Sequence, residues 1–330
     1  MSHPNSGMPG EILCYGEVLW DALPAGLFLG GAPFNVACHL AGAGARVAMV
    51  SRVGVDRLGE EAMRRAMAFG VATDLIQIDP ELPTGFVRAT VDDAGEARYE
   101  ILAPAAWDAI EPTAELQARA DKARCIVFGS LAQRQKVSRA TLERLWRGKA
   151  TMVFDINLRP PSEDADAIRK SLQRADVVKI NRAELAKLGA WFGLPKTERD
   201  AAAALASKFS CPVVCVTRGR DGAALWRDGQ WAEHPGFEVD VRDTVGAGDA
   251  FLAVLLTGLL AGTDSASILQ NANLIGAYVA TQFGAVPIDQ GQITSPTAPA
   301  APARPRAKPA AKKTGRPVPS ARRGPKRGGR

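Results

Sequence analysis

The chain has 330 residues, of which 46% are hydrophobic, so it is long and apolar enough for one large domain with a buried core. Its composition argues against a membrane span, because no run of about 18 apolar residues occurs. It also argues against a signal peptide, because residues 1–9 have no basic region followed by an apolar stretch. Five cysteines without a C-x-x-C pair and three scattered histidines argue against a zinc site, and they favour reduced thiols in a cytoplasmic protein.

The formal net charge of +6 is unevenly distributed along the chain. Residues 294–330 contain 11 Lys and Arg and no acidic residue, which leaves 30 basic and 35 acidic residues for the rest. Because this tail has almost no large apolar side chains to bury, we predict that residues 293–330 are disordered, as are residues 1–9, and that one domain spans residues 10–292. The tail could contact nucleic acid or another acidic surface. It lacks interleaved aromatic residues for base stacking, which favours a solvated extension without a specific partner.

Strand-like and helix-like segments alternate between residues 11 and 285. Apolar, β-branched segments predict strands at residues 11–19, 46–54, 125–130, 151–157, 176–181 and 212–219. Helical spacing of apolar residues predicts helices at residues 33–44, 57–70, 138–149, 197–209 and 251–262. Nearly continuous apolar strands separated by helices indicate an α/β fold, with a parallel sheet covered by helices on both faces.

Residues 84–102 break this alternation. Two segments of alternating polarity flank Asp93-Ala94-Gly95-Glu96, which predicts a β-hairpin. Inside an α/β body such a hairpin is an excursion from the main sheet. It is either a small β lid that excludes water from a pocket or an ordinary edge hairpin, and the pattern supports both interpretations equally.

The segment Asp243-Thr244-Val245-Gly246-Ala247-Gly248-Asp249 carries the clearest chemistry. It precedes the apolar helix predicted at residues 251–262, so three small residues at a helix start leave their backbone N–H groups exposed. These groups and the helix dipole form an anion site, and glycine lets a phosphate approach the backbone closely. Asp249 would orient a substrate hydroxyl and accept its proton while a phosphoryl group moves. Taken alone, the segment is equally well explained as a glycine turn with an aspartate N-cap.

Two segments resemble the signatures of the ribokinase/PfkB family of carbohydrate kinases. DTVGAGDAF at residues 243–251 resembles the C-terminal signature, and GGAPFNVA at residues 30–37, with residues 40–62 after it, is similar to the first signature. The resemblance spans residues 11–287, and the segments closest to the fructokinase-like branch are residues 16–21, 84–101, 105–110, 128–134 and 154–161. It implies a ribokinase-like, doubly wound, mostly parallel sheet with a small β lid. The implied activity is ATP-dependent phosphorylation of a small sugar, with fructose as the first candidate substrate. The basic tail and Phe34, where small residues are common, depart from the family pattern.

The resemblance also implies roles for individual residues. Asp249 would be the general base, and the amides of Gly246, Ala247 and Gly248 would form the anion hole. The sugar would be held by groups suited to vicinal hydroxyls, those of Asp21, Gly30, Gly31 and Asn35. Without the resemblance, the two glycines are equally a plain strand-to-helix turn, and Asp21 is equally a surface acid.

Further matches concern the nucleotide and metal ions. Asn181 and Glu184 resemble the family's N-x-x-E motif, which helps to position Mg²⁺ and the phosphates; a helix capping box is the alternative. A nucleotide loop, which is otherwise a common β-turn, matches at Thr217, Arg218, Gly219 and Gly222. Asn273 matches a purine-side position. Asp243 and Val245 match positions that bind a monovalent cation such as K⁺ in many relatives.

Arg134 and Arg159 are candidate cations on the substrate side of the site. Arg159 follows the carboxyl end of a predicted strand, where open α/β sheets bind ligands. For each arginine, a surface salt bridge is the alternative. The P-loop motif G-x-x-x-x-G-K-[ST] and the HRD and DFG elements of protein kinases do not occur, so the sequence excludes those kinase classes.

The sequence leaves the substrate and the partners open. Ribose, a nucleoside or a keto-deoxy sugar acid is the alternative substrate, and a sugar acid would require a cation in the pocket. The alternative of another class is a catalytically silent relative that senses sugar or is tethered to nucleic acid, against which the intact Gly-Ala-Gly-Asp argues. Some relatives dimerise by pairing their lids, so a homodimer through the lid is a further expectation.

Overall fold

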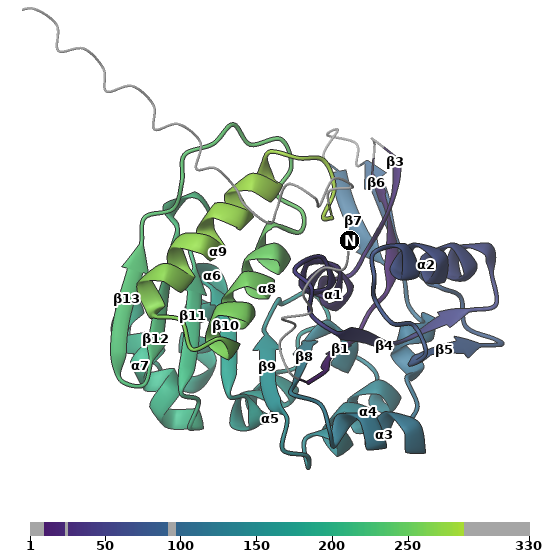
Figure 1. Ribbon diagram of the computed structural model, residues 1–330, viewed down its shortest axis with the longest axis horizontal. Coiled ribbons are helices and arrows are strands. Elements are labelled where there is room, and N and C mark those ends of the chain that lie inside the picture. Colours follow the sequence, from purple (N-terminus) through teal and green to yellow (C-terminus); the bar gives the residue numbers. More distant parts are fainter. Residues whose placement is uncertain (1–9, 24–25, 92–96, 287–330) are drawn as a thin grey trace, which may run out of the picture. The chain divides into compact units, whose positions relative to one another are not determined.

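A nine-stranded sheet forms the body of the computed structural model, which describes residues 10–23, 26–91 and 97–286 (Figure 1). Its strand order is β13-β12-β11-β10-β9-β8-β1-β4-β5. The parallel strands are β1 (Ile12–Tyr15), β4 (Val47–Gly54), β5 (Ile76–Asp79), β8 (Cys125–Gly129), β9 (Thr151–Asp155), β10 (Val177–Asn181) and β11 (Val213–Thr217). At one edge, β12 (Ala223–Arg227) and β13 (Gln230–His234) are antiparallel to their neighbours.

Helices cover both faces of this sheet (Figure 1). They are α1 (Ala32–Gly42), α2 (Arg57–Ala68), α3 (Ala114–Ala120), α4 (Lys136–Leu145), α5 (Ala165–Arg174), α6 (Arg182–Phe192), α7 (Glu198–Phe209), α8 (Ala247–Leu260) and α9 (Ser265–Ala280). Because successive strand residues point to opposite faces, Phe154 packs in one core cluster with α4 and α7, and Val153 packs in another with α1, α8 and α9. The predicted α/β class with a mostly parallel, doubly wound sheet is confirmed.

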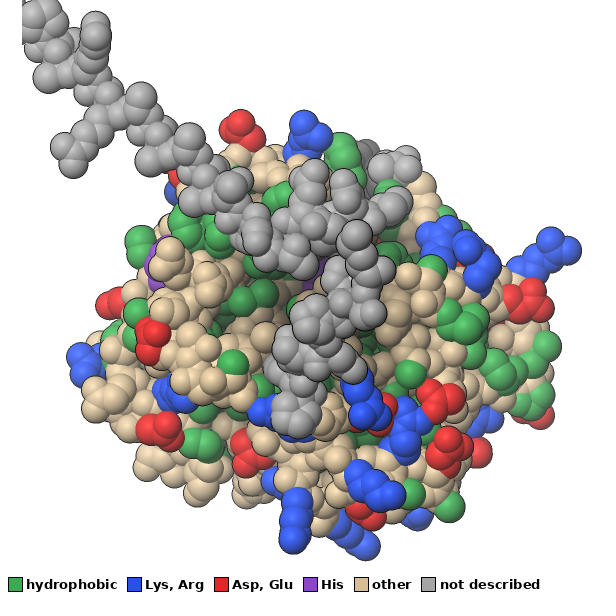
Figure 2. Space-filling view, in the orientation of Figure 1, with side chains coloured by type: hydrophobic (Ala, Val, Ile, Leu, Met, Phe, Trp, Pro, Cys, Tyr) green, Lys and Arg blue, Asp and Glu red, His purple; other side chains and the backbone are tan. Residues whose placement is uncertain are grey.

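The surface of the described residues mixes charges of both signs. On the face shown in Figure 2, Lys and Arg side chains are interspersed with Asp and Glu. This pattern differs from the one-signed surface that nucleic-acid binding favours. Of the helices in the described residues, none is long and apolar enough to cross a membrane. The predicted disorder of residues 1–9 and 293–330 lies outside the described residues, and the domain boundaries 10–292 stay a prediction.

Residues 19–23 and 26–30 form part of a second sheet instead of extending the first. The chain turns away from β1 at Gly16, whose φ of 146° favours glycine and where a Cβ atom would lie 2.7 Å from Pro33. In the described residues the second sheet has the order β3-β2-β6-β7, formed by β2 (Leu19–Leu23), β3 (Gly26–Gly30), β6 (Gly85–Val91) and β7 (Ala97–Ile101). The predicted hairpin is therefore half of a four-stranded sheet, and its tip at residues 92–96 lies outside the described residues. The single strand predicted at residues 11–19 is wrong, because β1 ends at Tyr15, residues 16–18 belong to no strand, and Leu19 begins β2 in the second sheet.

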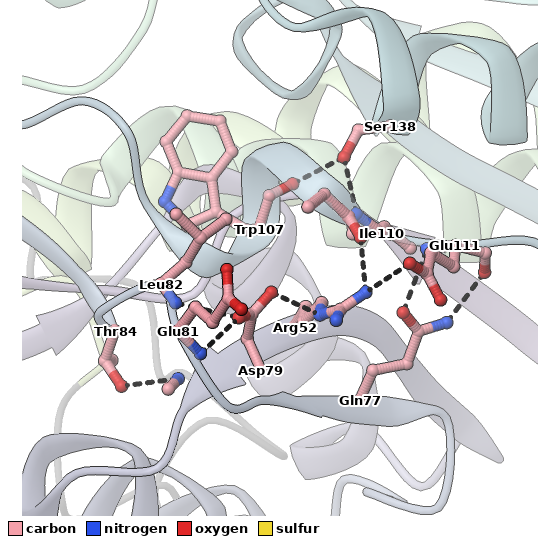
Figure 3. A network of polar contacts seen from close by, with 12 residues as sticks. Arg52, Gln77, Asp79, Glu81, Leu82, Thr84, Trp107, Ile110, Glu111 and Ser138 are labelled. Atoms are coloured by element: carbon pink, nitrogen blue, oxygen red, sulfur yellow. Dashed lines mark hydrogen bonds and ion pairs between the residues drawn. The ribbon is translucent and has the colours of Figure 1, made fainter.

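Polar contacts attach the four-stranded sheet to the larger one (Figure 3). Arg52, at the end of β4, pairs with Asp79 of β5 at 2.8 Å and donates to the carbonyl of Ala109 at 2.8 Å. Asp56 caps α2 and also accepts hydrogen bonds at 2.8 Å from the amide and the hydroxyl of Thr84, the residue before β6. The segment that leads into β6 is therefore held by Asp56 and Asp79, each of which accepts several hydrogen bonds.

Arg134, predicted as a substrate-side cation, belongs to this attachment. Its Nε and Nη2 atoms each lie 2.7 Å from an oxygen of Asp108, and Nη2 also donates to the carbonyl of Leu102, just after β7. The two side chains are only 7% and 3% exposed, and the guanidinium lies 4.0 Å from the centre of the Trp107 ring. The guanidinium of Arg134 thus donates its hydrogen bonds to acceptors within the protein, and the predicted contact with a substrate is not supported. We refer to Arg52, Asp56, Asp79, Asp108 and Arg134 as the root of the four-stranded sheet.

Candidate active site

The glycine turn before α8 has the geometry of a helix N-terminus. Gly246 is the N-cap residue with a φ of 77°, and a Cβ atom there would lie 2.4 Å from the Cα atom of Ala285. Only glycine fits a position with that φ and that contact. Asp249 lies in the first turn of α8 and is buried. The turn therefore presents a helix N-terminus, which favours anions, and a buried carboxylate lies beside it.

The two signature segments meet at Asp249. Asn35, on α1, donates from Nδ2 to Asp249 Oδ2 at 2.8 Å, across 214 residues of sequence. The other side-chain atom of Asn35, Oδ1, is buried without a hydrogen-bond partner in the described residues. This amide is thus positioned to orient the carboxylate and to accept a hydrogen bond from a bound hydroxyl.

Asp21 and the glycine pair lie next to Asn35. A Cβ atom on Gly30 would lie 2.9 Å from Asp21 Oδ2 and 3.8 Å from Asn35 Oδ1, so this glycine leaves the space between the two side chains open. Gly31 has a φ of 113°, and a Cβ atom there would lie 2.3 Å from the carbonyl oxygen of Glu17. Gly31 is therefore required by its φ and its close approach to Glu17, and the predicted sugar-side residues are close to the predicted base.

Carboxylates with raised pKa values gather here. Burial raises the pKa of Asp249 to about 6, although Lys179 opposes the rise. Burial likewise raises the pKa of Asp21 to about 6 and that of Glu17 to about 7. The charge of Arg159, an exposed residue just after β9, lowers all three pKa values. Arg159 thus faces the acids of the site, unlike Arg134.

Glu17 was not predicted as a site residue. Its Oε1 accepts from the amide of Ala32 at 3.2 Å at the start of α1, and its Oε2 is buried without a hydrogen-bond partner among the described residues. An acid inside an apolar predicted strand was the signal, since acids are rarely buried without a partner.

Lys179 and Asp155 were also not predicted. Both stand in apolar strands, β10 and β9, and they form a buried ion pair with N···O distances of 2.9 and 3.0 Å. A charged residue in each of two buried strands could have indicated such a pair.

The predicted nucleotide-side residues make protein contacts of their own. Glu184 and Asn181 form a reciprocal capping box at the start of α6, and the second oxygen of Glu184 accepts from the amide of Leu158 at 2.8 Å. Burial raises the pKa of Glu184. Asn273 donates to the carbonyl of Leu269 at 2.7 Å within α9.

The loop after β11 is a tight turn. Arg218 donates its backbone N–H to the carbonyl of Gly222 at 2.8 Å, and its side chain pairs with Glu198 and Glu233. Thr217 ends β11 and Gly219 has a φ of 61°. The turn contains a short 3₁₀ helix, Gly219–Asp221, in place of the plain β-turn considered as the alternative.

Asp243 fixes the loop that precedes the glycine turn. Its Oδ1 accepts from the amide of Val245 at 3.0 Å, and its Oδ2 accepts from the amide of Gly284 at 3.2 Å. In the described residues, no group of three or more His, Cys, Asp or Glu side chains could hold a metal ion by itself. A metal at Glu184 or Asp243 would therefore take most ligands from carbonyls, water or phosphate.

Comparisons with known proteins agree with this arrangement. The model of the pfkB family carbohydrate kinases matches residues 13–290. The fructokinase of Escherichia coli is 29% identical over 305 residues, which cover 84% of this chain and 96% of that protein. The fructokinase of Vibrio alginolyticus is 31% identical over 274 residues, which cover 78% of this chain and 87% of that protein.

Solved structures share the fold. A fructokinase with bound ATP from Xylella fastidiosa has a TM-score of 0.72 at 26% identity, covering 84% of this chain and 94% of its own. An aminoimidazole riboside kinase from Salmonella enterica has a TM-score of 0.70 at 23% identity, covering 86% of this chain and 100% of its own. The match to the family model over most of the sequence confirms the resemblance: the chain belongs to the pfkB family of carbohydrate kinases.

Proposed function

We propose that this carbohydrate kinase transfers the γ-phosphate of ATP to a hydroxyl of a small sugar, with Asp249 as the general base. Fructose is the first candidate substrate. The hydrogen bond from Asn35 to Asp249 at 2.8 Å is the observation that carries the proposal, because it joins both signature segments at one carboxylate. The relatives named fructokinase, at 29% and 31% identity, support fructose as the substrate.

The site suggests how the chain's residues act. Asn35 engages Oδ2 of Asp249, which leaves Oδ1 to accept the proton of the sugar hydroxyl as that oxygen attacks the γ-phosphorus and ADP departs. A pKa of about 6 leaves Asp249 mostly ionised at neutral pH and still basic enough to take a proton. Asp21 and Asn35 Oδ1 would hold neighbouring hydroxyls. The amides of Gly246, Ala247 and Gly248 would stabilise the charge on the transferring phosphoryl oxygens.

The proposal assigns ATP and the cations to the remaining predicted residues. ATP would lie against Asn181, Thr217, Arg218, Gly219, Gly222 and Asn273. Glu184 fits Mg²⁺ held through water, because each of its oxygens accepts one backbone N–H and keeps a further lone pair. Mg²⁺ would neutralise charge on the phosphates. The loop of Asp243 and Val245 would hold K⁺.

Arg159 supports a keto-deoxy sugar acid as the second candidate substrate. Its guanidinium is exposed and its charge acts on Asp21, Glu17 and Asp249. A substrate carboxylate could pair with it, because guanidinium and carboxylate match in geometry.

The test measures ADP release with Mg-ATP and fructose, ribose, a nucleoside or a keto-deoxy sugar acid, with K⁺ present. We expect one sugar to stimulate turnover, and Asp249→Asn to lower kcat by about 10²–10⁴-fold. Asp166→Asn changes an exposed acid and serves as the matched control, with wild-type activity expected. No turnover with any substrate would favour the catalytically silent, sugar-sensing relative instead.

Other sequence predictions stay predictions. They are the cytoplasmic location, the homodimer through the lid hairpin at residues 84–102 and the contact of residues 293–330 with nucleic acid or an acidic surface. Size-exclusion chromatography with light scattering tests the dimer, and binding to duplex DNA at low and high salt tests the tail.

A further inference from the structure

Lys179 and Asp155 face each other across two neighbouring strands. The register of β10 and β9 pairs their Cα atoms directly, and Gly129 and Cys215 are the register neighbours on either side. Both side chains lie on the sheet face that α1, α8 and α9 cover, because Val153 and Val177, two residues earlier in each strand, pack in that core cluster. The pair is therefore built into the sheet at its carboxyl edge, beneath α8.

Burying this ion pair is unfavourable for the stability of the fold. The side chains are only 10% and 6% exposed, and burying two charges costs free energy that their attraction often does not recover. The Lys179 ammonium has three N–H donors and uses two of them on Asp155. A residue that served stability alone would be replaced by an apolar side chain at little cost.

The ammonium lies against the glycine turn. A Cβ atom on Gly248 would lie 3.2 Å from Lys179 Nζ, and Gly248, unlike Gly246, has no positive φ that would require glycine. The ammonium therefore lies in close contact with the backbone of the turn at this position. It brings a positive charge to the first turn of α8, where Asp249 lies.

Several charged groups in the described residues act on Lys179 and Asp249, and the Cys215 thiol, next to Lys179 in the sheet, interacts with Lys179 as well. Lys179 interacts electrostatically with Asp155, Asp249 and Glu184. Asp249 faces Lys179, Asp155 and Arg159, and Glu17 feels its charge. Of the two cations, Arg159 is exposed and screened by solvent, whereas Lys179 is buried. Lys179 therefore dominates the stabilisation of the Asp249 carboxylate.

We infer that Lys179, oriented by Asp155, is a positioning residue whose buried charge keeps Asp249 ionised beneath the phosphate-binding turn. Asp155 fixes the ammonium at Gly248 by engaging it with both oxygens. Glu184, at the start of the next helix, links the same cation to the proposed Mg²⁺ side of the site. The inference rests on the proposed kinase function only where it treats Asp249 as the general base. The electrostatic interaction between Lys179 and Asp249 is a property of the folded protein whatever its function.

Two measurements on the full chain test it. The first is the titration of the Asp249 carboxyl carbon by NMR of ¹³C-aspartate-labelled protein, with the resonance assigned by its loss in Asp249→Asn. The second is the pH dependence of kcat/KM with the best sugar of the panel. Each is made on wild type, Lys179→Met, Lys179→Arg and, as the matched control, Lys170→Met, which removes an exposed lysine paired with Glu143.

We expect the Asp249 midpoint, near pH 6 in wild type, to rise by about one to three pH units in Lys179→Met, because an adjacent opposite charge is lost. The acidic limb of kcat/KM should move in the same direction, so that part of the activity returns at higher pH. Lys179→Arg keeps the charge and should keep the midpoint close to wild type, and Lys170→Met should change neither quantity.

An unmoved midpoint in Lys179→Met would overturn the inference, as would lower activity with an unmoved acidic limb. If Lys179→Met fails to fold, Lys179→Gln takes its place, since it also removes the charge and should raise the midpoint in the same direction. If wild type shows no turnover while the Asp249 midpoint is still higher in Lys179→Met than in wild type, the proposed kinase function fails, and the coupling between Lys179 and Asp249 stands. If wild type is active and the Asp249 midpoint is the same in Lys179→Met as in wild type, the inference about Lys179 alone fails.

Discussion

The carboxyl edge of the nine-stranded sheet and the root of the four-stranded sheet both bury acids, but they treat them in opposite ways. At the carboxyl edge, burial raises the pKa values of Asp249, Asp21 and Glu17 to between about 6 and about 7. At the root, burial also acts against the charged form of Asp56 and Asp79, but hydrogen bonds from backbone amides outweigh it and lower both pKa values. The difference is the number of donors per carboxylate.

Two buried cations show the same contrast. Arg134 at the root donates to both oxygens of Asp108 and to the carbonyls of Leu102 and Ile101. Lys179 at the carboxyl edge donates to Asp155 alone among the described residues, and its charge reaches other acids. A saturated buried cation fixes structure, whereas an unsaturated one beside acids adjusts their protonation. The comparison predicts that stability depends most on the root and that pH dependence arises at the carboxyl edge.

The largest expected effect on stability comes from Arg134→Met. It leaves Asp108 buried without its partner, so the free energy of unfolding should fall by about 3–5 kcal/mol. Urea unfolding at pH 7 measures this loss. The acidic limb of kcat/KM should stay in place, in contrast to Lys179→Met. A loss of stability below about 1 kcal/mol would remove the distinction between the two cations.

Glu17 should contribute to the pH dependence of stability, together with Asp21 and Asp249. Its folded-state pKa is about 7, against an ordinary value of 4.5, so below pH 4.5 the acid is neutral in both states and above pH 7 the fold holds a buried charge. Unfolding free energy should therefore rise as pH falls from 8 to 5, with a contribution on the order of 2–3 kcal/mol from this residue.

Glu17→Gln measures that contribution, because glutamine stays neutral and can still accept from Ala32. The variant should be more stable than wild type at pH 8 and close to it at pH 4.5. Burial lowers the pKa of His39, which acts in the opposite direction below its ordinary value of 6.5. His39 is present in both proteins, so their difference isolates Glu17. Identical pH dependence in urea unfolding would contradict the prediction.

Asp56→Ala should have an intermediate effect. It removes the cap of α2 and the acceptor for Thr84, and loss of an N-cap costs about 1 kcal/mol. Because the folded-state pKa of Asp56 is lowered, its contribution is present above the ordinary value of 3.8 and is lost as pH falls through the folded-state pKa. Thermal unfolding should therefore separate wild type from the variant at pH 7, and the separation should narrow as the pH is lowered below 3.8. Asp56→Asn, which keeps an acceptor, should recover most of the loss.

The smallest expected effect comes from Arg88→Ala on β6. Arg88 pairs with Glu100 across the four-stranded sheet at 3.0 Å, but both side chains are exposed. Such pairs contribute about 0–1 kcal/mol. Urea unfolding should show almost no change, and a large loss would mean that this part of the sheet is less exposed than the structure indicates.

Much of the candidate site could be predicted because its residues stand in two contiguous segments. Gly30, Gly31 and Asn35 lie in one, and Gly246 and Asp249 lie in the other. Each is a strand-to-helix or loop-to-helix junction whose glycines have a local reason. Arg134 was misplaced because its partners, Asp108 and Leu102, are far from it in sequence. A lone arginine carries no local sign of whether its donors are satisfied.

Taken by itself, the sequence determined the α/β class, the order of most strands and helices, the hairpin and the glycine turn, because each follows from local periodicity or turn chemistry. Only the tertiary structure decided that residues 19–23 and 26–30 join the hairpin in a second sheet, that Asn35 meets Asp249, and that Lys179 pairs with Asp155. These contacts depend on which strands become neighbours and in what register. That choice is made by long-range packing, which no local pattern encodes.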